Sequence, residues 1–236
     1  MCSSDLGLSA LLSFLITSSW TGPHAASRDA QVTLDPVGFI LGAGLNLGQL
    51  TICVLGVLVI STEYSTGVIR ASLLAVPRRL PMLAAKGVVL AALLFVVAEV
   101  VCFCSFFLGS AILHSRVPVS LSDNNVTRAV VGAGLALTVL GVFSMAIGGL
   151  IRHTAGAITT SIGIVFVLPI LSGLLPSSWG AHVNGYLPEQ AASVVAQAHA
   201  PAGGNVLSAW EGFGVFCLWT AVLLVACAIL LRRRDA

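Results

Sequence analysis

Residues 82–113 of the chain read MLAAKGVVLAALLFVVAEVVCFCSFFLGSAIL, and only Lys86 and Glu99 among them are charged. A helix needs about 20 predominantly apolar residues to cross a hydrocarbon layer about 30 Å thick, so this stretch is long enough. A segment surrounded by lipid must also satisfy its backbone hydrogen bonds internally, which favours a helix. The stretch therefore predicts a membrane-spanning helix.

The rest of the chain repeats this pattern. Further apolar runs that predict spanning helices occur at residues 6–20, 37–60, 129–151, 155–175 and 213–231. Of all 236 residues, 57% are hydrophobic and 8% are charged, whereas a soluble domain carries about 25% charged residues. We therefore expect an all-α polytopic membrane protein with six transmembrane helices, organised as one domain over residues 1–236.

Basic residues are distributed unevenly between the loops. One set of connections holds Arg70, Arg78, Arg79, Lys86, Arg152, Arg232, Arg233 and Arg234, whereas the alternate set holds only Arg28, Arg116 and Arg128. Cytoplasmic loops carry the excess of Lys and Arg, so the first set, and with it both termini, is expected in the cytoplasm. Aromatic residues agree, since they flank the predicted outer boundaries at Trp20, Trp179, Tyr186 and Trp210.

The first apolar run, residues 6–20, is the shortest and is not preceded by a basic residue. A signal peptide ending near Ala25 and Ala26 would normally open with positive charge, which argues against cleavage there. We expect instead a truncated first span or a foreign start at residues 1–6.

The segment after the second run predicts a short amphipathic cytoplasmic helix over residues 62–76. Ser61 or Thr62 suits its N-cap, and Pro77 suits its end. One side of this helix is polar and another is apolar, with Glu63, Thr66, Gly67 and Arg70 on the first and Ile69, Leu73 and Val76 on the second. Two roles stay open on physical grounds: a lever that transmits a push from a cytosolic partner, or an interfacial anchor whose Arg78 and Arg79 meet anionic lipid.

Several separate blocks of sequence occur in the order typical of one family. They are EYSTG at 63–67, AVPRR at 75–79, VSLSD at 119–123, RHTAGA at 152–157, LPI at 168–170, LPSSW at 175–179 and LLRRRDA at 230–236. With these blocks the chain resembles actinobacterial permeases of the type-2 ABC exporter class, and the resemblance covers nearly the whole chain. Members usually begin with a basic amphipathic segment before the first span, and the sequence departs from the family there.

The resemblance implies a six-helix permease subunit that dimerises in the plasma membrane and moves an amphiphile, such as a lipid or drug, outward. It implies a coupling helix that contacts a separate ATP-binding subunit through Glu63, Tyr64, Thr66, Gly67, Arg70, Arg78 and Arg79. None of these residues is expected to be catalytic. The chain has no Gly-x-x-x-x-Gly-Lys-Ser/Thr motif, so ATP and Mg²⁺ are expected on the partner, and the chain is not expected to be an enzyme or to bind nucleic acid.

Glu99 is the only acidic residue deep inside a predicted span, and an ionisable group there is costly enough to suggest a function. It could line a substrate path, with Asn46 as a possible neighbour, or pair across a dimer. A protonated Glu99 bonded to a neighbouring helix, or one that faces a watery vestibule, explains the sequence equally. The rival classes are a secondary transporter that uses Glu99 and a non-transporting membrane anchor or immunity protein.

Small residues predict where helices approach closely. Gly44 and Gly48 stand at GxxxG spacing in the second run, and Gly141 and Gly148 lie in the fourth. The external loop, residues 176–212, predicts a short surface helix from Pro188 to Val195 and serves as a plain connector or as a cap on an exit path. The five histidines are scattered without metal-site spacing, so no metal is expected.

Overall fold

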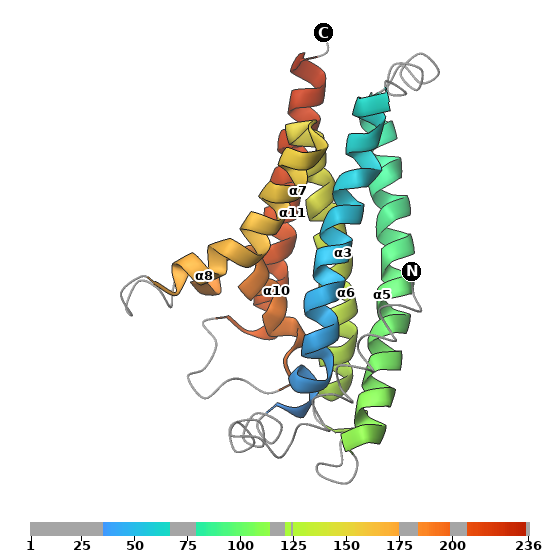
Figure 1. Cartoon of the computed structure of the whole chain (residues 1–236), viewed down its shortest axis with the longest axis vertical. Coiled ribbons are helices and arrows are strands. Elements are labelled where there is room, and N and C mark those ends of the chain that lie inside the picture. Colours follow the sequence, from blue (N-terminus) through green and yellow to red (C-terminus); the bar gives the residue numbers. More distant parts are fainter. Residues whose placement is uncertain are drawn as a thin grey trace.

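The computed structural model describes residues 35–66, 79–113, 121–123, 125–174, 184–198 and 207–234. Within these ranges every regular element is helical, and Figure 1 shows the longest helices standing side by side in a bundle. The long helices are α3 (Pro36–Thr66), α5 (Arg79–Leu113), α6 (Val126–Ile151) and α11 (Ala209–Arg234). The shorter elements are α7 (Thr154–Ile162), the π-helical η1 (Gly163–Val167), α8 (Leu168–Ser172) and α10 (Pro188–Ala196).

The described part of the chain contains five stretches that are long and apolar enough to cross a membrane. They are Ile40–Thr62, Leu83–Ala111, Val126–Ile151, Thr154–Ser172 and Ala209–Leu230. They coincide, within a few residues at their ends, with five of the six predicted spans, so helices of spanning length at these five places and an all-helical fold of the described residues are confirmed. The sixth predicted span, residues 6–20, lies outside the described residues.

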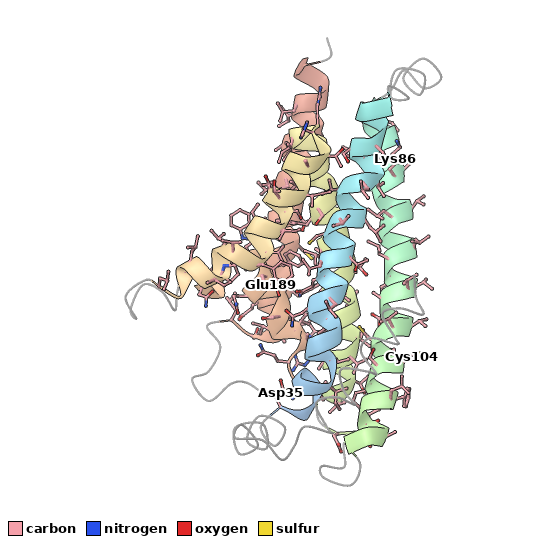
Figure 2. All side chains as sticks on the ribbon, in the orientation of Figure 1. Asp35, Lys86, Cys104 and Glu189 are labelled. Carbon is pink, nitrogen blue, oxygen red and sulfur yellow. The ribbon has the colours of Figure 1, made fainter. Side chains whose placement is uncertain are left out.

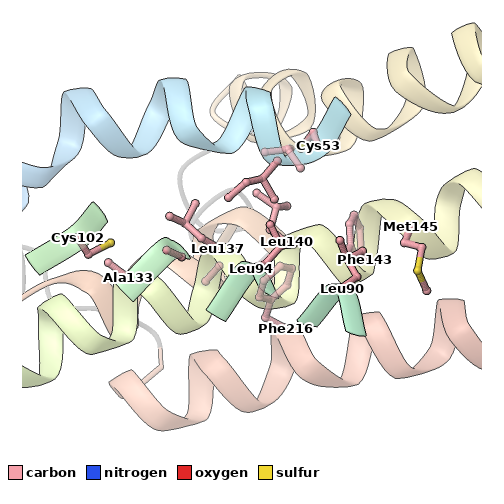
Figure 3. Packing of buried hydrophobic residues seen from close by; sticks show 14 of the residues in the cluster. Cys53, Leu90, Leu94, Cys102, Ala133, Leu137, Leu140, Phe143, Met145 and Phe216 are labelled. Carbon is pink, nitrogen blue, oxygen red and sulfur yellow. The ribbon is translucent and has the colours of Figure 1, made fainter. Parts of the chain in front are cut away.

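Helix α6 is the centre of the bundle. Its spanning stretch is 72% buried within the protein, whereas the other four stretches are 17–25% buried. Apolar side chains of α5 and α11 pack onto it, and Figure 3 shows Leu90 of α5 and Phe216 of α11 near Phe143 of α6. The Phe143 and Phe216 rings lie 5.8 Å apart between centroids. Lipid tails are as apolar as these side chains, so close packing rather than expulsion of water holds such helices together.

Glycines let α6 and its neighbours approach at backbone distance. A Cβ built on Gly148 would lie 3.0 Å from the Val57 carbonyl oxygen of α3, and a Cβ on Gly56 would meet the Gly141 carbonyl oxygen. The predicted packing positions Gly141 and Gly148 therefore lie in helix contacts.

For Gly48 the described residues give no such contact, because a Cβ there would meet none of their atoms within 4 Å. The close approach of α3 to α6 at Gly56 lies about 12 Å further along the helix, at 1.5 Å per residue. Gly44 lies on α3, but its surroundings are outside the described part of the structure.

Helix α3 begins with a cap and ends beyond the predicted boundary. The Asp35 carboxylate accepts the Gly38 N–H at 3.0 Å, and Pro36 occupies the first position, where its missing N–H costs nothing. At the other end α3 continues through Thr66, and the Thr62 hydroxyl donates to the Leu58 carbonyl oxygen at 2.6 Å. The predicted helix start at Ser61 or Thr62 is therefore wrong, because the spanning helix does not break there. The rest of the predicted coupling helix, residues 67–76, lies outside the described residues.

The fifth span bends near its middle. Its first part is α7, the π-helical turn η1 follows, and Pro169 occupies the first turn of α8. Proline lacks an N–H and its ring crowds the preceding turn, and a π turn is a recognised way to absorb such a defect. Figure 1 shows α8 leaving the bundle at an angle to α7, as expected from a break at this proline.

The helix predicted to begin at Pro188 is present as α10, Pro188–Ala196. It is not a surface helix, however, because Pro188, Ala191, Ala192 and Val195 are all buried. Glycine provides the room: a Cβ on Gly132 would lie 2.5 Å from the Val195 carbonyl oxygen of α10. Helix α10 is therefore packed into the bundle.

Candidate functional site

The basic residues gather where several helices end together. Figure 1 shows the C-termini of α3, α6 and α11 and the N-termini of α5 and α7 at the same end of the bundle. Arg79, Lys86 and Arg152 belong to this end, and Figure 2 shows Lys86 close to it. Arg128 stands in the first turn of α6, at the opposite end. The charge asymmetry of the sequence thus becomes an asymmetry between the two ends of the bundle.

Some of the predicted partner-facing residues lie at the ends of helices, and the others lie outside the described residues. Glu63, Tyr64 and Thr66 lie in the last turn of α3, and Arg79 is the first residue of α5. Gly67, Arg70 and Arg78 lie outside the described residues. Helices α3 and α5 therefore lead directly into and out of the predicted contact segment.

At the same end, Arg152 and His153 form the tight link between α6 and α7. Arg152 adopts a left-handed conformation, with φ 57°, and its N–H donates to the Gly148 carbonyl oxygen at 3.0 Å. His153 caps α7, because its Nδ1 accepts the Gly156 N–H at 3.3 Å. Histidine is not among the preferred N-cap residues, so this cap has no signal in the sequence.

A hydrogen-bonded pair of side chains, which was not predicted from the sequence, holds the beginning of α10 against α3. The Gln49 side chain of α3 donates Nε2–H to the Glu189 carboxylate at 2.9 Å, across 140 residues of sequence. Figure 2 labels Glu189 where α10 lies beside the bundle. Burial raises the pKa of the Glu189 carboxyl, and the hydrogen bond from Gln49 opposes that shift.

The other end of α10 is fastened from α6. The Arg128 side chain donates Nη2–H at 2.9 Å to the carbonyl oxygen of Gln197, the C-cap residue of α10. Between the two ends, a Cβ on Gly212 of α11 would lie 2.7 Å from the Ala191 carbonyl oxygen. Three spanning helices therefore hold α10, and its carbonyl oxygen at the C-cap has a cationic partner.

The two residues assigned to a possible substrate path do not meet. Asn46 is exposed, and its Nδ2–H donates to the Gly42 carbonyl oxygen of its own helix at 2.7 Å. Glu99 faces Gly134 of α6, and both of its carboxylate oxygens are buried without a hydrogen-bond partner in the described structure. The structure therefore gives no pairing of Asn46 with Glu99.

A buried serine pair joins α6 to α7. The hydroxyls of Ser144 and Ser161 lie 2.9 Å apart, and both residues are fully buried. His153 is committed to the cap of α7, so this hydroxyl pair has no described histidine as a base. Among the described residues no group of three or more His, Cys, Asp or Glu side chains could hold a metal ion.

These features define a polytopic membrane protein with a basic end and with α10 packed against its long helices. The family model for ABC-2 family transporter protein matches residues 26–236, so the chain belongs to that family. The family assigns the chain as a permease of an ABC transporter, and such permeases generally pair with an ABC ATP-binding subunit. No curated protein and no solved structure matches the chain.

Proposed function

We propose that the chain is the membrane-spanning subunit of an ABC exporter, which moves an amphiphilic substrate such as a lipid or drug outward across the plasma membrane. The observation that carries this proposal is the family match over residues 26–236. The missing P-loop motif supports ATP and Mg²⁺ on a separate subunit, so the chain itself catalyses no reaction. The resemblance of its sequence blocks to actinobacterial permeases supports the outward direction and an actinobacterial source.

In the proposed topology six helices span the membrane, with residues 6–20 as the first, and both termini face the cytoplasm. The basic end of the bundle supports this orientation, because cytoplasmic ends carry the excess of Lys and Arg. Helix α10 then lies toward the outer surface. Its anchors, Gln49 and Arg128, favour a cap on the outer end of the bundle over a plain connector.

The ATP-binding subunit docks on the basic end, and residues 67–78 form the coupling segment. Because this segment continues directly into α3 and α5, a displacement of it would move both spanning helices. Two copies of the chain, or one copy and a second permease, complete the transporter. Closure of the ATP-binding subunits would then open a path for substrate on the opposite side.

The proposal is tested by co-expressing the chain with the ATP-binding subunit from the same source and purifying the permease in detergent. Native protein is expected to retain the partner, whereas Glu63→Ala, Arg70→Ala and Arg78→Ala are expected to lose it and still elute as folded protein. Glu211→Gln is the matched control, because this exposed carboxylate lies at the first turn of α11, at the other end of the bundle. Failure of the native chain to retain any ATPase would remove the ABC assignment of function.

A secondary transporter is the second candidate, and the unpartnered carboxylate of Glu99 is the observation that favours it. The energy source distinguishes a secondary transporter from an ABC exporter. Transport that continues after the partner's ATPase is inactivated and stops when the proton gradient is collapsed would favour the second candidate.

A further inference from the structure

Two contacts fix the depth at which α10 begins. The first is the hydrogen bond from Gln49 of α3 to Glu189 in the first turn of α10. Gln49 lies about 20 Å along α3 from Thr62, where the α3 span ends at the basic end of the bundle, at 1.5 Å per residue. A hydrocarbon layer is about 30 Å thick, so Glu189 lies about 10 Å inside the opposite boundary.

The second contact gives a similar depth from another helix. Trp219 of α11 donates its Nε1–H at 3.1 Å to the carbonyl oxygen of Tyr186, which precedes α10. Trp219 lies about 17 Å along α11 from Leu230, where that span ends at the basic end, and therefore about 13 Å inside the opposite boundary. Figure 2 likewise labels Glu189 beside the middle of the bundle, away from Asp35 at the start of α3.

The other end of α10 lies near that boundary. Arg128, in the first turn of α6, bonds the Gln197 carbonyl oxygen, and Gly132 of the same helix approaches the Val195 carbonyl oxygen. The 9 residues of α10 extend about 14 Å, which is enough to reach from its deep start to the boundary. Helix α10 therefore occupies one half of the layer without crossing it.

The start of α10 holds polar groups that lipid cannot satisfy. Leu187 at the N-cap makes no side-chain hydrogen bond, so no cap of that kind serves the N–H groups of the first turn. Asn184, Glu189 and Gln190 add polar side chains, and all three are only half-buried. Irregular backbone at this depth is tolerated only where protein buries it or where it lines a water-filled cavity. Because the protein leaves these residues partly exposed, water must reach them.

We propose that water from the outer side reaches the start of α10, so that Asn184, Glu189 and Gln190 line a polar vestibule about 10 Å deep beside α3 and α11. Helix α8 ends at the same place, because the Ser172 hydroxyl donates to Asn184 Oδ1 at 2.9 Å. The vestibule gives the polar group of an amphiphile contact with water before the apolar part has left the membrane. This inference rests on the proposed function, and in particular on its orientation.

The test is labelling of single introduced cysteines in intact cells that co-express the ATP-binding subunit, with a permanently charged, membrane-impermeant methanethiosulfonate. Asn184→Cys and Gln190→Cys are expected to react, because the reactive thiolate forms where water reaches the thiol. Gln190 is the second variant because its described hydrogen bond uses the backbone carbonyl oxygen, which the substitution keeps. Labelling is measured by peptide mass at each position, so the native cysteines do not contribute.

Leu218→Cys is the matched control at the same depth. Leu218 precedes Trp219 on α11 and is 64% exposed, so an introduced thiol there is open to lipid. It should react at least about tenfold more slowly than Asn184→Cys or Gln190→Cys, because an apolar surrounding raises the pKa of a thiol. Ser208→Cys, exposed just before α11, is the positive control for the outer side.

Labelling of Ser208→Cys without labelling of Asn184→Cys or Gln190→Cys would overturn the inference. Equal reactivity of Leu218→Cys would also overturn it, since the start of α10 would then lie outside the lipid. If Ser208→Cys reacts only in inverted vesicles, the proposed orientation falls, and with it a vestibule open to the outside. Retention of the ATP-binding subunit is measured on the same samples. If the subunit is never retained while labelling follows the expected pattern, the proposed transport function falls and the vestibule stands.

Discussion

The packing of α3 on α6 predicts that alanine at Gly56 weakens the bundle. A Cβ at this position would meet the Gly141 carbonyl oxygen and would lie 2.9 Å from the Ser144 Cβ. A backbone carbonyl in the middle of α6 cannot rotate away as a flexible side chain does. Overpacking of this kind costs about 1–3 kcal/mol, and the lower chain entropy of alanine returns about 0.5–1 kcal/mol. The middle of these two ranges gives a net loss of about 1–2 kcal/mol.

The assay is the melting midpoint of the purified protein in detergent, followed by size-exclusion chromatography after heating. For a domain of this size about 1 kcal/mol corresponds to about 2–4 °C, so Gly56→Ala should melt about 2–8 °C below the native protein. Gly48→Ala is the matched control on the same helix, because its Cβ would meet nothing within 4 Å. It should be neutral or slightly stabilising. Equal melting of Gly56→Ala and the native protein would refute the packing of α3 on α6.

Three further predictions concern the polar contacts. Ser161→Ala removes the serine partner of the fully buried Ser144 hydroxyl, which keeps only the weaker contact with the Cys53 thiol, and should destabilise by about 1–3 kcal/mol. The Ser144→Ala, Ser161→Ala double variant should recover part of this loss, and additive effects in the melting assay would contradict the pairing. The raised pKa of Glu189 means that the folded state favours its protonated form, so its contribution is complete below the ordinary carboxyl range and is lost as pH rises through the raised pKa. The melting midpoint of native protein relative to that of Glu189→Gln should therefore fall as the pH rises above about 4.3. Melting midpoints of the two proteins that change in parallel with pH would contradict the burial of this carboxyl. Arg128→Met removes the cation from the Gln197 carbonyl oxygen, so amide hydrogen exchange at the end of α10 should accelerate while exchange in the centre of α6 stays slow; unchanged exchange in α10 would count against the anchor.

The sequence predicts the spanning helices well because their signal is local. A run such as residues 82–113 contains its own reason to be a helix, since lipid leaves the backbone no other partner. The start of α10 was also predictable, because Pro188 at a first helical position is a local signal. Each of these predictions needed no knowledge of neighbouring helices.

The contacts that the sequence did not predict depend on packing between segments far apart in the chain. Whether Gly48 or Gly56 meets another helix depends on where α3 and α6 come closest, and residue spacing along α3 cannot give that position. The contact of Gln49 with Glu189 joins residues 140 positions apart and has no motif. The start of the cytoplasmic helix was misplaced because Thr62 suits a cap in isolation, yet its hydroxyl can equally bond the Leu58 carbonyl oxygen inside a continuing helix.

Glu99 is unusual in the sequence, and the structure describes its surroundings. Its position inside an apolar run marks it as unusual from the sequence alone. The structure adds that its oxygens are unpartnered, that Gly134 leaves room for them, and that Asn46 bonds its own helix instead. The sequence therefore marks the residue, and the structure describes its surroundings.

The most direct test of the account is where the ATP-binding subunit touches this chain. A photo-crosslinking side chain would be placed singly at Thr66, Arg70 or Arg152 at the basic end, and at Asn125 or Ser208 at the opposite end, in the co-expressed complex. We predict crosslinks to the ATP-binding subunit from the first three positions and none from the last two. Crosslinks from Asn125 or Ser208, with none from the basic end, would contradict both the orientation and the coupling role proposed for residues 67–78.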